Sequence, residues 1–192
     1  MTSASESWIP LTESERNILL RLARESIRSA VSGHNPPVLE EVPPMLRQPA
    51  AVFVTLYLGA ELRGCVGTLE AREPLYRAVV AMARAAALDD PRFPPVQMEE
   101  VESLTIEAAR LSPLRPARPE EIVVGVHGVC LQWGSSRAVF LPKVAREYGW
   151  SREELLDHLA RKAGLAAHAW REDDARLYVF TAEAFAESPD TP

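Results

Sequence analysis

The feature that most constrains the fold is the stretch from Ala51 to Glu70, which reads AVFVTLYLGAELRGCVGTLE. Residues 52–58 are β-branched or apolar with one threonine and one tyrosine, a composition typical of a buried strand. A short connection, Gly59-Ala60-Glu61, separates this run from a second one. The pattern therefore predicts an antiparallel hairpin with strands over residues 51–58 and 62–69.

The second strand of this hairpin carries the most distinctive motif, Leu62-Arg63-Gly64-Cys65-Val66-Gly67. Because side chains alternate between the faces of a strand, Arg63, Cys65 and Gly67 are expected to share one face. Glycine inside a strand often marks a bulge or the close approach of a ligand or another segment. We therefore predict a binding site formed by Arg63, Gly64, Cys65 and Gly67.

Two interpretations of Cys65 follow from this motif. A guanidinium near a thiol favours the thiolate, so Arg63 could activate Cys65 as a nucleophile. Free cysteine is also among the most buried residue types, and a single cysteine without a partner base is weak evidence for catalysis. We expect the second role, a sulfur buried among the small residues Gly64, Val66 and Gly67.

The composition excludes several classes of protein. The chain has 192 residues, enough for one core or for one core with a small lobe. Its net charge of −6 argues against nucleic-acid binding, which needs clustered cations. The start lacks a basic region followed by an apolar run, and no stretch of 18 apolar residues occurs. We therefore expect a cytoplasmic protein with no membrane partner.

The rest of the chain mixes helices and strands without a regular alternation. A capping box, Thr12 to Glu15, predicts a helix over residues 13–32, and a second helix should follow Pro74 and end before Asp89. Strands are expected over residues 102–111, 122–126, 129–133, 138–141 and 177–180, and helices over 142–149, 151–164 and 182–186. This predicts an α+β fold with a largely antiparallel central sheet flanked by helices. The proline-rich segment 112–119 is the candidate boundary of a smaller lobe within a single domain, residues 1–192.

Further candidate residues lie outside the hairpin. The segment Asp90 to Pro95 holds three prolines, so it should be a stiff loop that presents Asp90, Arg92 and Phe93. Glu107 lies on a predicted strand, as a solvated charge or a proton-transfer group. His127 lies in a tight turn, where a hydrogen bond to the backbone is the expected outcome and a catalytic role the alternative.

Several kinds of site are not supported by the sequence. No paired cysteines or histidines have the spacing of a structural zinc site, so we predict no metal. The glycines after Arg63 match neither of the common phosphate-binding motifs, and no nucleophile elbow is found. These patterns therefore leave any cofactor undetermined.

Several separated motifs together resemble the AMMECR domain family. They begin with residues 62–67 and continue through Asp-Pro-Arg-Phe-Pro-Pro at 90–95, Leu-Thr-Ile-Glu at 104–107 and Leu-Ser-Pro-Leu at 111–114. Further along are Gly-Val-His-Gly at 125–128, Leu-Pro at 141–142, Lys-Ala-Gly-Leu at 162–165 and Trp170. The motifs occur in one order from roughly the first helix to Phe185, which makes chance similarity a poor explanation.

The resemblance implies a larger and a smaller lobe separated by a cleft, with residues 90–95 packed against residues 63–67 as one wall. It also implies an association with a Memo-like protein and a radical SAM protein, as in the AmmeMemoRadiSam system. The leading hypothesis is therefore an accessory or binding module. The alternative is a cysteine-dependent enzyme in which Cys65 is the nucleophile and His127 or Glu107 transfers the proton.

Overall fold

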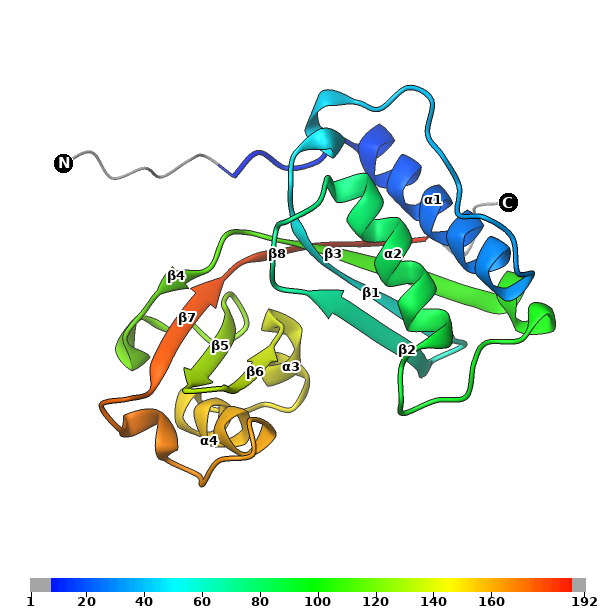
Figure 1. The fold of residues 1–192 in the computed structure, drawn as a ribbon. Coiled ribbons are helices and arrows are strands. Elements are labelled where there is room, and N and C mark those ends of the chain that lie inside the picture. The colour runs from blue at the N-terminus through cyan, green and yellow to red at the C-terminus, as the bar shows by residue number, and fades with distance from the viewer. Residues whose placement is uncertain (1–7, 188–192) are drawn as a thin grey trace. The chain divides into compact units, whose positions relative to one another are not determined.

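The protein is an α+β structure whose strands form two separate four-stranded sheets (Figure 1). A computed structural model describes residues 8–187. These residues divide into two compact units: unit 1 contains those up to Leu111 and those from Glu183 onward, and unit 2 contains Ser112–Ala182. The expected α+β class is confirmed, but the strands are shared between two sheets and do not form one central sheet.

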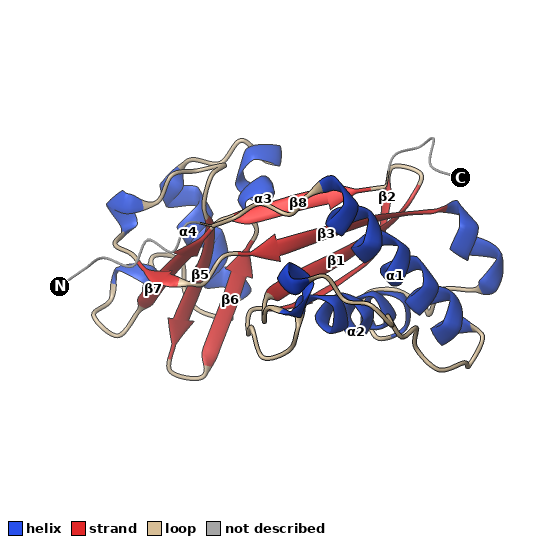
Figure 2. Ribbon diagram, turned by 90° about the horizontal axis from the view of Figure 1, so that it is seen from above, coloured by secondary structure: helices blue, strands red, loops and turns tan. Residues whose placement is uncertain are grey.

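Unit 1 is a sheet with helices on one face. Its strands are β1 (Ala51–Leu58), β2 (Glu61–Thr68), β3 (Leu104–Leu111) and β8 (Ala182–Ala186), in the spatial order β2-β1-β3-β8. Two α-helices, α1 (Glu13–Val31) and α2 (Leu75–Leu88), lie side by side along this sheet (Figure 2). The short 3₁₀ helices η1 (Pro44–Arg47) and η2 (Met98–Ser103) complete the unit. The main core lies between the helices and the sheet.

Local signals account for the first helix of unit 1, α1. The Thr12 side chain accepts a hydrogen bond from the N–H of Glu15, and the Glu15 side chain accepts one from the N–H of Thr12. This is the predicted capping box, and Gly33 follows the helix with a φ of +71°. A left-handed φ is easily adopted by glycine, so α1 ends where the sequence predicted.

The β1–β2 hairpin is confirmed, with a register that the sequence pattern did not predict. Leu58 pairs with Glu61 and Tyr57 with Leu62, but Leu56 pairs with Gly64, so Arg63 is the extra residue of a β-bulge. The bulge interrupts the expected alternation of side chains. Leu62, Cys65 and Gly67 therefore share one face, opposite the face that packs on α2.

The last strand, β8, is the clearest correction to the expected elements, because residues 182–186 were predicted to form a helix. Alanine and glutamate favour helix locally, but here the segment lies beside β3 as the fourth strand of unit 1 (Figure 2). Just beyond the strand, the N–H of Glu187 donates to the carbonyl of Ile106 over 3.0 Å. Pairing with β3 therefore overrides local propensity.

Unit 2 is a smaller sheet with its own core. Its strands are β4 (Arg115–Pro116), β5 (Gly128–Trp133), β6 (Ser136–Phe140) and β7 (Arg176–Phe180), in the order β4-β7-β5-β6. The helices are η3 (Pro119–Glu121), α3 (Pro142–Glu147), α4 (Arg152–Lys162) and η4 (Ala169–Arg171). No helix in the described part of the chain is long and apolar enough to cross a membrane.

One expected strand of unit 2 is a turn. Residues 122–126 were predicted to be extended, but the N–H groups of Val126 and His127 both donate to the carbonyl of Val123. Gly125 has a φ of +81°, which a strand does not use. Ile122 of this run is buried in the core and Val124 packs against it, whereas Val123 and Val126 are exposed. The apolar residues therefore flank a turn instead of forming a strand.

Candidate functional site

The backbone of Cys65 is held by a loop that follows α2. Strand β2 lies at the edge of its sheet, and the N–H of Cys65 donates to Oδ2 of Asp90 over 2.8 Å. Arg92 donates from Nη2 to the carbonyl of Cys65 over 3.3 Å, and from Nε and Nη2 to the two oxygens of Asp90 over 2.9 and 2.7 Å. We call these three residues the Cys65 clasp. The expected contact of residues 90–95 with residues 63–67 is confirmed. That these residues form one wall of a cleft stays a prediction.

The clasp perturbs the ionisation of both of its charged groups. Hydrogen bonding from the Arg92 side chain lowers the pKa of Asp90 to about 2, and the N–H groups of Cys65 and Arg92 act in the same direction against burial. The same hydrogen bond raises the pKa of Arg92, with smaller contributions from the charge of Asp90 and from Cys65. The Asp90 side chain is only 3% exposed, so its charge is compensated inside the protein.

This pKa predicts a loss of stability in acid. The pKa of Asp90 is lower in the folded protein than in the unfolded chain, so its stabilising contribution is complete above about pH 4 and disappears as the pH falls towards 2. The shift corresponds to about 2 kcal/mol. Urea unfolding at pH 4.5 and at pH 2 measures how much free energy of unfolding each protein loses between these two pH values. The wild type should lose about 2 kcal/mol more than Asp90→Asn. Equal losses in the two proteins would contradict the assignment.

Arg63 lies in this region, but its guanidinium binds groups other than the thiol that the sequence hypothesis gave it as a neighbour. Its guanidinium donates to both carboxylate oxygens of Glu100 in η2, over 2.8 and 3.0 Å, and to the carbonyl of Pro94 over 2.8 Å. The hydrogen bond from Arg63 lowers the pKa of Glu100. The bulge directs Arg63 towards the loop and η2, so Arg63 holds the loop and η2 in place. The cation that interacts with Cys65 is Arg92.

The two glycines of the motif, Gly64 and Gly67, lie in close contact with α2 and with the ring of Phe53. A Cβ on Gly64 would overlap the carbonyl oxygen of Ala86 in α2, and a Cβ on Gly67 would overlap the ring of Phe53. Their small size therefore allows α2 and Phe53 to approach β2. Cys65 is half-buried, so the expectation of a sulfur enclosed by these small residues is wrong.

The sulfur of Cys65 belongs to a row of polar side chains across three strands. Cys65 is opposite Thr55 in β1, and Thr55 is opposite Glu107 in β3. Opposite residues in antiparallel strands project from the same face, so all three lie on the face away from α1 and α2. Thr55 Oγ1 donates to Cys65 Sγ over 3.3 Å. We call these three residues the Cys65 row.

Phe93 and His127 have separate surroundings. The guanidinium of Arg92 lies 5.4 Å from the ring centre of Phe93, so the aromatic ring supports the clasp. His127 belongs to unit 2, where its Nδ1 accepts the N–H of Val123 over 3.2 Å, which confirms the expected turn histidine. Burial lowers the pKa of His127, and the charge of Arg115 acts in the same direction. The other sequence-predicted site residues all lie in unit 1.

Two members of the site were missed from the sequence, Thr55 and Glu100. Thr55 is the only polar residue besides Tyr57 in an apolar strand, a signal that could have indicated a special position. Glu100 gave no local signal, because its partner Arg63 lies 37 residues away. Among residues 8–187, no group of three or more histidine, cysteine or acidic side chains is arranged to hold a metal ion.

The family model described as AMMECR1 matches residues 20–185. A protein from Methanothermobacter thermautotrophicus is 37% identical over 94% of this chain and 98% of its own length. Protein MJ0810 from Methanocaldococcus jannaschii is 38% identical over 92% of each chain.

A solved structure gives the same result for the fold. The crystal structure of the uncharacterised protein PH0010 from Pyrococcus horikoshii has a TM-score of 0.89 to this chain, with 35% sequence identity. The alignment covers 95% of this chain and 96% of that one. The family match over residues 20–185 includes every residue of the clasp and the row.

Proposed function

Because the chain belongs to the AMMECR1 family, we propose that it is a cytoplasmic accessory protein that binds Memo-like and radical SAM partner proteins. The partners come from the family resemblance. One observation on unit 1 supports a binding role: large apolar side chains are exposed around the turn of the β1–β2 hairpin. Isolated exposed apolar residues are common, but a group of them at one site is typical of a protein-binding surface.

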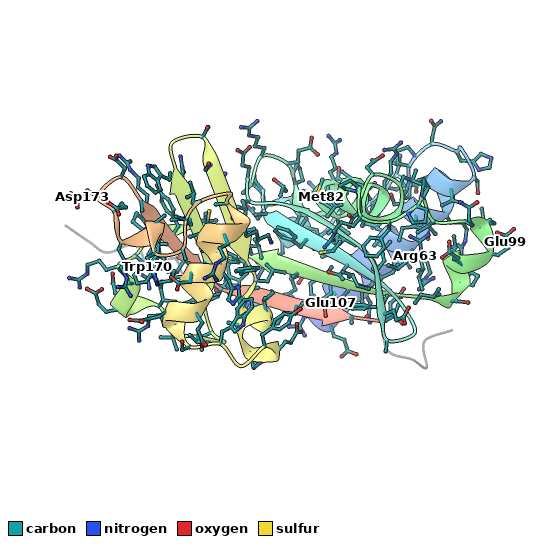
Figure 3. All side chains as sticks on the ribbon, turned by 90° about the horizontal axis from the view of Figure 1, so that it is seen from below. Arg63, Met82, Glu99, Glu107, Trp170 and Asp173 are labelled. Carbon is teal, nitrogen blue, oxygen red and sulfur yellow. The ribbon has the colours of Figure 1, made fainter. Side chains whose placement is uncertain are left out.

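This hairpin surface consists of Leu58, Leu62 and Met98, which are 38%, 39% and 42% exposed. Leu58 and Leu62 flank the turn, and the neighbouring Arg63 connects the hairpin to η2, which begins at Met98. Arg63 and Glu99 lie at the same end of the unit (Figure 3). The bulge and the Arg63–Glu100 ion pair hold these elements together, so the surface is preorganised for binding.

The exposed acidic residues Glu61 and Glu99 border the apolar group. An apolar centre with a charged rim is the usual anatomy of a protein interface. The negative rim favours a partner surface that carries apolar side chains among lysines or arginines. The proposed partners are therefore expected to present such a basic and apolar surface to unit 1.

Binding can be tested with purified Memo-like and radical SAM proteins encoded in the same genome as this chain. Replacing Leu62 by aspartate puts a charge in the centre of the hairpin surface, and we expect a loss of affinity of at least tenfold, about 1.4 kcal/mol. Isothermal titration calorimetry measures this directly. Val38→Asp is the matched control, because Val38 is 86% exposed on a loop outside the surface.

Two results would contradict the proposal in different ways. If neither partner binds the wild-type chain, the accessory role with these partners is wrong. If a partner binds both variants as tightly as it binds the wild type, the hairpin surface is wrong. Circular dichroism of both variants provides the control for folding.

A cysteine-dependent enzyme is the second candidate function. The observation that favours it is the position of Cys65, a half-buried residue whose thiol lies between a hydroxyl donor and a guanidinium. Neither of these two neighbours is a base, so an enzyme would need a proton acceptor elsewhere.

A further inference from the structure

Three of the four edge strands in the two sheets are closed to further pairing. At the edge formed by β2, the clasp occupies the N–H and the carbonyl of Cys65, and the bulge at Arg63 interrupts the strand. Strand β4 has only two residues, and one of them is Pro116. At the edge formed by β6, Nζ of Lys162 donates to the carbonyl of Val139 over 2.9 Å. Short strands, prolines, bulges and charged side chains are the features that keep a sheet from pairing with another chain.

The fourth edge strand, β8, pairs with β3 in a regular register (Figure 2). At one end the N–H of Ser112 donates to the carbonyl of Thr181, and at the other the N–H of Glu187 donates to the carbonyl of Ile106. Six residues separate the two contacts on each segment, so the pairing is antiparallel and has no bulge between them. The odd-numbered residues of β8 are therefore the ones whose backbone groups face β3.

The outward positions of β8 are all alanine. Because residues alternate along an antiparallel pair, the N–H and carbonyl groups of Ala182, Ala184 and Ala186 face away from β3. Within residues 8–187, no strand or side chain bonds to these groups. Ala184 and Ala186 are exposed, whereas Glu183 forms an ion pair with α1 and Phe185 lies in the main core. This edge therefore presents unused backbone groups that only methyl side chains accompany.

We propose that β8 pairs with β8 of a second copy of this chain. The two strands run antiparallel about a twofold axis at Ala184, so that Ala184 lies opposite the partner's Ala184. Ala182 then lies opposite the partner's Ala186, and the outward N–H and carbonyl groups of both strands bond to each other. The result is one continuous sheet in which the helices of both copies lie on the same face.

Two features of the edge favour a second copy over a strand from another protein. An added foreign strand gains its specificity from pockets for alternate side chains, and a row of alanines offers none. In a symmetric pair the twofold axis fixes the register without such pockets. The only charged side chain of β8, Glu183, is held by Arg16 and Arg110 over 2.8 Å each. No unpaired charge of one strand therefore faces the other.

The size of the contact predicts a weak dimer. Pairing through one short strand buries less than the roughly 1,200 Å² of a standard interface, so we expect a dissociation constant of about 0.1 mM. Strands β8 and β2 are at opposite edges of the same sheet, so the dimer leaves the hairpin surface free. The inference does not depend on the proposed partners.

The twofold axis allows a sharp test by sedimentation equilibrium of the full chain. Ala184→Lys puts two positive charges opposite each other at the axis, and Ala184→Glu puts two negative charges there. We expect each variant alone to dimerise at least about tenfold more weakly than the wild type. An equimolar mixture of the two variants should dimerise again, within about threefold of the wild type, because lysine then faces glutamate.

Ala184→Pro tests the backbone bonds themselves. It removes an N–H that β3 does not use, so the fold should be kept while dimerisation weakens at least about tenfold. Ala71→Lys and Ala71→Glu are matched controls, because Ala71 is an exposed alanine of a loop outside the sheets. Both should dimerise like the wild type, alone and mixed. Circular dichroism checks that each variant is folded.

Three results would overturn the inference. The first is a wild type that stays monomeric up to about 1 mM, tenfold above the expected dissociation constant. The second is a dimer that Ala184→Lys and Ala184→Glu leave as tight as the wild type. The third is a mixture of these two variants that dimerises no better than either variant alone. The lysine and glutamate variants decide the question even if Ala184→Pro does not fold.

Discussion

Replacing Gly64 by alanine is expected to lower the free energy of unfolding of unit 1 by about 3 kcal/mol. The new Cβ would overlap the carbonyl oxygen of Ala86, which is a backbone atom of α2. A flexible side chain could move aside, but here the helix itself must shift. Because α2 packs against both β1 and β2, that shift would disturb the main core of unit 1. Urea unfolding followed by circular dichroism measures the loss.

Cys65→Ala is the matched control for this prediction. Cys65 is the next residue on the same strand, but it projects from the opposite face and is half-buried. Its truncation should cost about 1 kcal/mol, because it removes one sulfur atom and leaves α2 in place. Equal stabilities of Gly64→Ala and the wild type would show that α2 is not packed as closely on β2 as the structure indicates.

Replacing Glu187 by alanine should lower the stability of unit 1 by a similar amount, about 3 kcal/mol. Glu187 accepts two hydrogen bonds from Arg24 of α1, over 2.8 and 2.5 Å, and one from the N–H of Ile106 over 3.0 Å. Both side chains of the ion pair are about one-fifth exposed. Without Glu187, Arg24 keeps a partly buried charge without its anion, and the Arg16–Glu183 ion pair is left to link β8 to α1.

A second ion pair on α1 serves as the control. Arg28 and Glu102 lie one turn away from Arg24, but their side chains are 47% and 69% exposed. Exposed pairs of this kind contribute about 0.5 kcal/mol or less, so Glu102→Ala should be almost neutral. Thermal unfolding of the two variants under the same conditions measures the difference. A cost for Glu102→Ala as large as that for Glu187→Ala would mean that burial and the bond to Ile106 do not matter.

The sequence by itself determined the elements whose signals are local. The hairpin follows from an apolar run, a glycine turn and a second extended run, and its two strands are observed within one residue of the prediction. The first helix follows from the capping box at Thr12 and the stop at Gly33. These signals operate within a few residues, so they can be interpreted without knowledge of distant contacts. The family resemblance is also confirmed, by the match over residues 20–185.

Only the tertiary structure decided which residues meet at Cys65. Counting from the turn pairs Thr55 with Gly64, and the bulge at Arg63 shifts that partner to Cys65. The bulge places the guanidinium of Arg63 against Glu100, and the loop after α2 brings Arg92 to the thiol in its place. Residues 182–186 likewise favour a helix by composition and form a strand because β3 offers them a partner. In each case the deciding interaction joins residues far apart in the chain, and a pattern of neighbouring residues carries no information about it.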